Sequence, residues 1–207
     1  MPGVNLDEIQ TWIDRVQIRV VIEEWPMWRE NPNWEKLRAC YTPDGKMETA
    51  ASTGSADDFV RFSQALEDKR TVRPYHLLSG SAIEVNGDRG FSQTRGVVMV
   101  RGVVEGVEAD LTAYGRSFDF FERRKGRWQI KERRGIYDWD RLDPVLPGAR
   151  IEVDPAKLAS YPRSYRFLCY FNECNGVPQN LNLTLPGGEG EAELFRRGAA
   201  WLKDGVL

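Results

Sequence analysis

The sequence predicts an α+β protein, with helices at the start of the chain packed against one face of a bent antiparallel sheet. Two observations predict this class. Apolar residues recur every three or four positions near the start of the chain, and β-rich runs separated by short turns follow from about residue 75. With 207 residues, of which 41% are hydrophobic, the chain is long enough to bury a core.

The first expected element is an amphipathic helix that begins after Asn5. Asn5 and Glu8 have the spacing of a capping box. The apolar residues at helical spacing are Leu6, Ile9, Ile13, Val16 and Val20. Because proline lacks the N–H group that a helix interior needs, we expect a kink or a break at Pro26.

Two shorter helices are expected next. Asn33 is placed to cap a helix over residues 34–40, and Ser55 marks the start of another that runs to about Glu67. Between them, residues 42–45 (sequence TPDG) have the composition of a turn.

Four strands are expected after these helices. Glycine-containing turns at residues 86–88, 104–106 and 124–126 separate runs that are rich in β-branched and aromatic residues. The expected strands cover about residues 75–85, 89–103, 107–123 and 127–137. Short turns between consecutive strands predict an antiparallel meander.

Residues 147–207 are expected to form a helical extension behind a sheet domain of residues 1–146. Residues 143–148 have the composition of a linker, and two helices are expected over residues 165–175 and 191–203. Their apolar side chains predict that the helices dock on the sheet domain, where they close a pocket mouth or form a subunit interface. We favour an interface with partial pocket closure, and we expect a homodimer or homotrimer.

Charge and composition disfavour several classes of partner. Lys and Arg total 29 and Asp and Glu total 31, so nucleic acid and membrane surfaces are not expected partners. No signal peptide or membrane-spanning run is visible, which predicts a cytoplasmic protein. The three cysteines form no CxxC pair, and nucleotide-binding and HExxH motifs are absent. We therefore expect no metal and no cofactor, and acid–base chemistry by side chains.

His76 is the only histidine of the chain and the first candidate for that chemistry. It lies at the start of the first expected strand, near the helices. A neutral imidazole takes up and releases protons near pH 7. Glu30, at the end of the first helical region, is placed to accept a hydrogen bond from His76 and to fix its tautomer. The alternative is a purely structural histidine beside apolar residues.

Aromatic and polar residues around this pair are candidates for substrate binding. Trp25 and Trp28, with Trp34, predict an aromatic wall, although tryptophans at helical spacing are also ordinary core residues. The candidate hydrogen-bond donors are Tyr75, Arg95, Tyr114 and Ser117.

Charged residues near the candidate site have a structural alternative. Arg95 and Arg116 lie within expected strands, where an ion pair is the favoured role. The candidate partners are Glu108, Asp110, Asp119 and Glu132. Arg29 is expected to be a solvated charge.

Three segments in this order resemble the SnoaL-like branch of the nuclear-transport-factor-2-like superfamily. They are residues 33–37 with 41–45, His76 with the strand that ends at residues 85–88, and residues 115–130 continuing into Glu132-Arg133. The resemblance covers about residues 5–140. It implies a cone-shaped sheet wrapped around helices, with a deep pocket between them. The enzymes of this superfamily include dehydratases, isomerases, epoxide hydrolases, cyclases and other lyases. The resemblance therefore implies one of these activities, and the fold alone does not say which.

The candidate site is most similar to the scytalone dehydratase-like branch of that superfamily. This resemblance implies a catalytic pair of His76 and Glu30, with Trp25 beside it. The chain departs from that branch in having Arg29 where the branch has a tyrosine, and Val98 near the position of its second histidine. The departures weaken the match to that branch's own substrate and leave histidine-based elimination in place.

The predicted function is a cofactor-independent lyase that dehydrates a small, hydrophobic or aromatic molecule or eliminates a small carbonyl fragment such as formaldehyde. The alternatives are a non-catalytic binder of a hydrophobic molecule and a partner subunit of an oxygenase. Isomerase and epoxide hydrolase activities are less expected, because the strand carboxylates that they use are not clearly placed.

Overall fold

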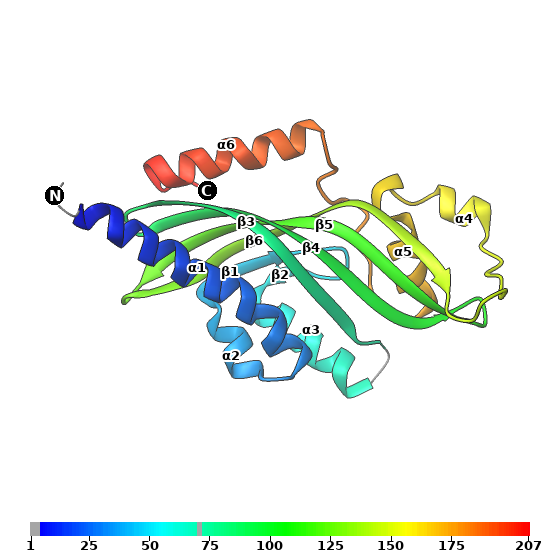
Figure 1. Ribbon diagram of the computed structural model, residues 1–207. Helices are drawn as coiled ribbons and strands as arrows, with labels where there is room; N and C mark the ends of the chain where they lie inside the picture. The colour runs from blue at the N-terminus through cyan, green and yellow to red at the C-terminus, as the bar shows by residue number, and fades with distance from the viewer. Residues whose placement is uncertain (1–4, 70–71) are drawn as a thin grey trace.

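The computed structural model describes residues 5–69 and 72–207 (Figure 1). The helices are α1 (Leu6–Glu30), α2 (Trp34–Ala39), α3 (Ala56–Lys69), α4 (Pro155–Ala159), α5 (Arg166–Cys174) and α6 (Glu189–Asp204), with a 3₁₀ turn, η1, at Arg163–Tyr165. The strands are β1 (Tyr41–Glu48), β2 (Thr53–Ser55), β3 (Pro74–Asn86), β4 (Arg89–Val104), β5 (Val107–Arg124) and β6 (Arg127–Pro144). Within the described ranges, no helix is both long and apolar enough to span a bilayer.

One curved sheet forms the centre of the molecule, with the strand order β2-β1-β6-β5-β4-β3. Strands β3 to β6 form the expected antiparallel meander. Helices α1, α2 and α3 lie on the concave side of the sheet (Figure 1). The predicted α+β class, with N-terminal helices packed on a bent sheet, is confirmed.

Strand β1 was not expected, because residues 42–45 suggested a turn. These residues instead lie within β1, which pairs in parallel with β6 and antiparallel with β2. The pairing with β6 is irregular between Tyr41 and Lys46, so a bulge takes up the proline and the glycine of this segment. The turn prediction is wrong because turn composition also suits a bulged strand.

Helix α1 begins as predicted and continues further than predicted. The side chain of Asn5 accepts hydrogen bonds from the backbone N–H groups of Asp7 and Glu8. The helix then runs through Pro26 to Glu30, so no break occurs at the proline. A proline removes one N–H and crowds the preceding turn, and here Pro26 is buried with Trp25, so packing holds the helix together.

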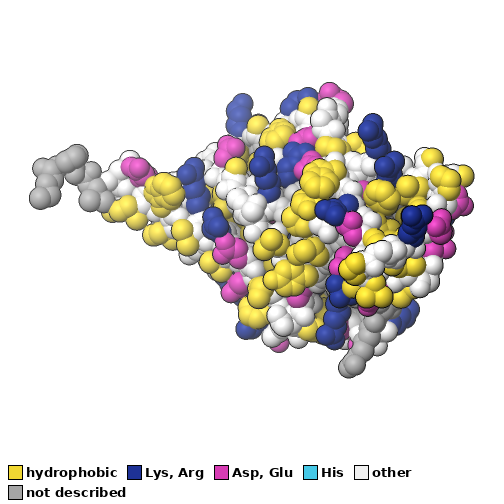
Figure 2. All heavy atoms as spheres, turned by 45° about the vertical axis from the view of Figure 1, so that its right-hand side comes forward, with side chains coloured by type: hydrophobic (Ala, Val, Ile, Leu, Met, Phe, Trp, Pro, Cys, Tyr) yellow, Lys and Arg dark blue, Asp and Glu magenta, His cyan; other side chains and the backbone are white. Residues whose placement is uncertain are grey.

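The apolar stripe that predicted α1 is not its buried face. Ile18, Ile22 and Trp25 are buried against the sheet, together with Asp14, which accepts hydrogen bonds from Trp128 Nε1 at 3.0 Å and Arg123 Nη1 at 2.7 Å. The stripe itself is exposed at Leu6, Ile9, Ile13, Val16 and Val20. Figure 2 shows apolar side chains on this projecting end of the molecule. The apolar periodicity predicted where the helix lies, and tertiary packing determines which of its faces is buried.

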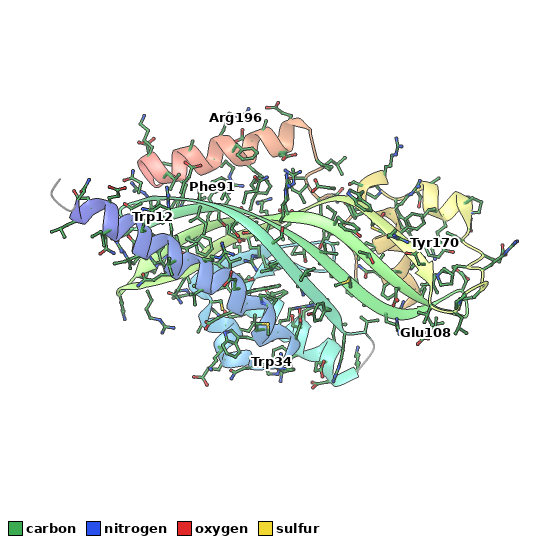
Figure 3. All side chains as sticks on the ribbon, in the orientation of Figure 1. Trp12, Trp34, Phe91, Glu108, Tyr170 and Arg196 are labelled. Carbon is green, nitrogen blue, oxygen red and sulfur yellow. The ribbon has the colours of Figure 1, made fainter. Side chains whose placement is uncertain are left out.

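The C-terminal helices dock on both faces of the sheet, as the apolar content of this region predicted. Tyr165, Leu168 and Phe171 form one buried cluster with residues of β4 and β5. On the opposite face, α6 packs Leu194 and Trp201 against aromatic side chains of the sheet. One of these is Phe91, between α6 and the sheet (Figure 3). Strand β6 extends to Pro144, into the expected linker.

Candidate active site

A cavity with two lobes lies on the concave side of the sheet. The lobe named here the sheet lobe has a volume of about 100 Å³ and is lined by Ile22, Leu78 and Ser117, among others. The other, named here the α5 lobe, has a volume of about 90 Å³ and includes Leu168 and Phe171 of α5. The residues that line both lobes are Trp25, Met47, Thr49, His76, Val98 and Tyr137. The extension therefore closes one end of the cavity.

His76 lines both lobes and forms the predicted pair with Glu30, which lines neither lobe. Glu30 Oε1 accepts a hydrogen bond from the backbone N–H of His76 at 2.7 Å and lies 2.8 Å from the ring Nδ1. Both side chains are largely buried, with exposed fractions of 14% for His76 and 13% for Glu30. A carboxylate only accepts, so Nδ1 carries the proton and Nε2 of the neutral ring has a free lone pair.

The surroundings of His76 keep its ring neutral. Burial lowers the pKa of His76 below its usual 6.5, since the charged form loses its hydration. The hydrogen bond to Glu30 acts in the opposite direction, and the positive charges of Arg29 and Arg133 lower the pKa further. The result is a buried, neutral imidazole whose orientation is set by a carboxylate.

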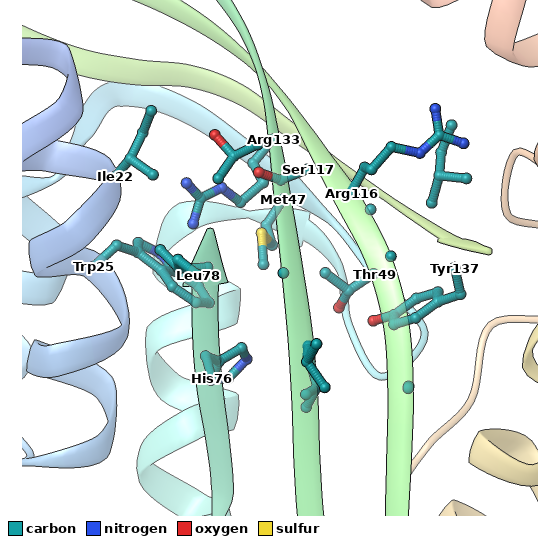
Figure 4. Close-up of a pocket in the computed structure, with 18 residues that line it drawn as sticks. Ile22, Trp25, Met47, Thr49, His76, Leu78, Arg116, Ser117, Arg133 and Tyr137 are labelled. Carbon is teal, nitrogen blue, oxygen red and sulfur yellow. The ribbon is translucent and has the colours of Figure 1, made fainter. Parts of the chain in front are cut away.

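Trp25 forms the wall beside the imidazole, as predicted. Its ring stands edge-on to His76, with the ring centroids 5.5 Å apart, and it stacks on Phe59. Its Nε1–H donates to the hydroxyl of Tyr41 at 2.8 Å. Trp25 is therefore held by contacts on several sides, which fixes the wall that a ligand would meet (Figure 4).

A buried ion pair lies at the sheet side of the cavity. Arg133 Nε and Nη2 donate to the two carboxylate oxygens of Asp119 at 2.6 and 2.9 Å. The Arg133 guanidinium lies 4.5 Å from the ring centroid of Trp25. Ser117, one of the predicted donors, donates to Asp119 at 3.2 Å and lines the sheet lobe. Asp119 was expected as a partner for Arg95 or Arg116, and it pairs with Arg133 instead.

Four predicted binding residues lie outside the cavity. Tyr75, Arg95 and Tyr114 are on the convex face of the sheet, because successive residues of a strand point to opposite faces and His76 and Ser117 occupy the concave positions. Tyr114 stacks there on Trp139, with ring centroids 3.7 Å apart. Trp28 points away from the cavity.

Trp28 lies on a different face of α1 from Trp25 and does not line the cavity. Its ring packs under the ammonium group of Lys36, 4.2 Å from the ring centroid, and its Nε1 donates to Glu24. Trp34 packs against the cluster around α1 and does not line either lobe. Only Trp25 of the three tryptophans reaches the cavity.

The charged residues differ from expectation in two further ways. Arg116 pairs with Asp138 at 2.6 Å and with Glu191 of α6, so its partners come from the neighbouring strand β6 and from the extension. Arg29 is not solvated: its Nε and Nη1 atoms are buried, and it lines the α5 lobe. The end of α1 is enclosed by other elements, which its own sequence does not reveal.

Tyr137 lines both lobes and is a cavity residue that the sequence pattern did not single out. Its hydroxyl group points into the cavity opposite His76, toward Thr49 (Figure 4). Burial raises the pKa of Tyr137, so the hydroxyl stays protonated and can donate. Tyr137 pairs with Gly115 in the sheet register. Continuing the strand alternation from Ser117 across to β6 would have found it.

Helices that enclose a cavity against a bent antiparallel sheet define a protein of the nuclear-transport-factor-2-like, cystatin-like fold. Within that class, the chain belongs to the SnoaL-like domain family, whose sequence pattern matches residues 10–134. The predicted resemblance is confirmed.

Two fungal relatives match most of the chain. Pea pathogenicity protein 2 of Fusarium vanettenii is 30% identical over 178 residues, which cover 84% of this chain and 76% of the relative. An uncharacterised protein of Emericella nidulans is 30% identical over 207 residues, covering 92% of this chain and 86% of the relative. The similarity to the Emericella nidulans protein therefore includes much of the C-terminal extension.

Solved structures share the fold at low sequence identity. A protein provisionally assigned as a scytalone dehydratase from Novosphingobium aromaticivorans is 18% identical, with a TM-score of 0.53, and the match covers 69% of this chain and 95% of that one. The hexachlorocyclohexane dehydrochlorinase LinA-type3 of Novosphingobium barchaimii is 16% identical, with a TM-score of 0.56, and the match covers 72% and 99%. These likenesses show the fold alone.

Proposed function

We propose that this protein is a cofactor-independent lyase that uses His76 as a general base on a small, hydrophobic or aromatic molecule. The observation that carries the proposal is the Glu30–His76 hydrogen bond of 2.8 Å, formed by the imidazole that lines both lobes. It holds the proton on Nδ1 and leaves Nε2 as a base. A buried imidazole whose tautomer is fixed by a carboxylate and whose other nitrogen faces a cavity is the arrangement that general-base catalysis needs, so the pair supports an enzyme over a simple binder.

The proposed step is the removal of a proton from carbon followed by loss of a neighbouring group. Nε2 takes the proton, the electron pair of the C–H bond forms a double bond, and the C–O bond to the leaving hydroxyl breaks. The imidazolium returns its proton to that hydroxyl, and water leaves. The Tyr137 hydroxyl supplies a donor that meets negative charge as it develops.

The cavity supports a compact apolar substrate. Trp25, Phe59 and Ile22 provide flat and branched apolar walls. Volumes of about 100 and 90 Å³ each exceed the roughly 10–15 Å³ that one water needs, so the two lobes together accept a small organic molecule. The named activities of two structural neighbours, a dehydratase and a dehydrochlorinase, are both eliminations, in agreement with the proposed reaction type.

The proposal is tested by following proton removal and elimination separately. Aryl β-hydroxy ketones are suitable probes, because their dehydration gives a conjugated enone that absorbs in the near ultraviolet. In D₂O, a general base also exchanges the α-proton for deuterium, which proton NMR detects. His76→Ala is expected to lower both rates at least ~100-fold while circular dichroism stays native. Equal rates in the variant and the parent would contradict the proposal.

A further inference from the structure

The α5 lobe contains an arginine whose buried N–H groups have no hydrogen-bonded counter-ion among the described residues. Arg29 lines this lobe, and its Nε and Nη1 atoms are buried without a hydrogen-bond partner among residues 5–69 and 72–207. Within those residues, no carboxylate lies within ion-pair distance of it. Its neighbour Glu30 is engaged with His76. Arg29 makes a long cation–π contact with Phe59, in which the ring centroid lies 5.8 Å from the guanidinium carbon.

Other arginines near the cavity are paired. Arg133 is bound by Asp119, and Arg116 is bound by Asp138 and Glu191. A buried guanidinium without a partner destabilises the folded protein, because it has lost water and gained no anion. Burial lowers the pKa of Arg29, yet an arginine remains protonated at neutral pH. The charge of the adjacent Glu30 raises the pKa of Arg29, but no carboxylate of the described residues is hydrogen-bonded to its buried N–H groups. Arg29 therefore brings a positive charge and unpaired N–H donors to the wall of the cavity.

A second unpartnered donor lies in the same lobe. Asn172 of α5 has an exposed fraction of only 6%, and its Nδ2 has no hydrogen-bond partner within the described part of the chain. It lines the α5 lobe together with Arg29, although the two residues come from opposite ends of the chain. The remaining wall is largely apolar, with Phe59, Leu168 and Phe171. Two independent elements thus leave donors unsatisfied around one small space.

We propose that the α5 lobe binds a carboxylate group, held by Arg29 and Asn172, so that the molecule taken into the cavity is a small organic acid with an apolar body. A planar guanidinium matches a carboxylate in shape and charge, and the amide adds a further N–H donor. The binding of this acid follows from the α5 lobe alone. Its role as the substrate rests on the proposed function. With the carboxylate in the α5 lobe, the apolar body extends past His76 toward Trp25 and the sheet lobe.

The test uses two probes of nearly equal shape, benzoate and benzamide, with binding measured by titration calorimetry at pH 7. The parent protein is expected to bind benzoate at least about 10-fold more tightly than benzamide, the scale of charge-assisted hydrogen bonds. Arg29→Met removes the charge and keeps an unbranched chain, and it should abolish the preference. Asn172→Leu should reduce it. Arg95→Met, on the convex face, is the matched control and should leave it unchanged.

Thermal melting provides a second readout that does not need a ligand. Burial acts on Arg29 more strongly than the charge of Glu30 does, and no carboxylate of the described residues is hydrogen-bonded to it. Arg29→Met is therefore expected to melt at the same temperature as the parent or higher. A parent protein that binds neither probe, or binds both equally, would overturn the carboxylate site, as would an Arg29→Met protein that keeps the preference. His76→Ala should retain the preference for benzoate. If that variant also retained activity, the lyase proposal would fall while the carboxylate site stood.

Discussion

The imidazole of His76 is subject to opposing influences from its neighbours. Burial and the cations Arg29 and Arg133 lower its pKa, while Glu30 raises it. The net effect is a lowered pKa, so the His76 imidazole is neutral at pH 7 and becomes protonated only as the pH falls. The pairing of His76 with Glu30 was predictable, because a strand start and a helix end lie close together in this arrangement of helices and sheet. The burial of Arg29 was not, since it depends on α3 and α5.

Replacing Glu30 by Gln is expected to weaken the base without removing it. The amide oxygen can still accept the Nδ1 proton, so the tautomer is kept, but the negative charge that raises the pKa of His76 is lost. The acid limb of the pH–rate profile should move to lower pH. The loss of rate should be smaller than the ~100-fold expected for His76→Ala. An unchanged acid limb would show that Glu30 does not control the base.

At the scale of elements, α1 has two faces with different tasks. One face buries Ile18, Ile22 and Trp25, and the end of the helix brings Glu30 to His76. The other is the exposed apolar stripe, in which Leu6 is 75% exposed. The sequence predicted the start of α1 from its cap, and it did not predict the buried face, because Asp14 reaches Arg123 and Trp128 only in the folded sheet. An exposed apolar stripe on a projecting helix is typical of a surface that meets another molecule.

The homodimer or homotrimer expected from the sequence therefore remains a prediction, now placed on this stripe. Light scattering on the full chain should give more than the mass of one chain. Ile13→Asp puts a charge in the middle of the stripe and should shift the mass toward the monomer. Arg196→Asp, on the outward side of α6 (Figure 3), is the control and should leave the mass unchanged. A monomeric parent protein, or an unaltered oligomer in Ile13→Asp, would exclude this interface.

For the whole molecule, the extension completes the fold. Tyr165, Tyr170 and Phe171 are at most 1% exposed and share a core with β4 and β5. The four meander strands were predictable because glycine turns and β-branched residues mark them locally. The position of the extension was not, because docking on two faces of a sheet depends on surfaces far apart in the sequence. Strand β1 was missed for the same reason, since its partner β6 lies some ninety residues later.

Truncation after Gly148 is expected to prevent stable folding. Each large buried side chain contributes about 1.5–3 kcal/mol, so losing three of them removes much of a typical stability of about 5–15 kcal/mol. The shortened chain should aggregate or lose its cooperative melting transition in circular dichroism. A soluble truncated chain that melts like the parent would show that the extension is dispensable for the fold.

The central claim, a neutral His76 that Glu30 holds in the Nδ1–H tautomer, is tested most directly by NMR. The chain has a single histidine, so a tag-free, ¹⁵N-labelled protein gives one set of imidazole signals, and no substrate is needed. Long-range ¹H–¹⁵N spectra across a pH titration report the protonated nitrogen and the pKa together. We predict a proton on Nδ1 and a pKa below 6.5. An Nε2–H tautomer, or a ring that is still protonated at pH 7, would contradict the account.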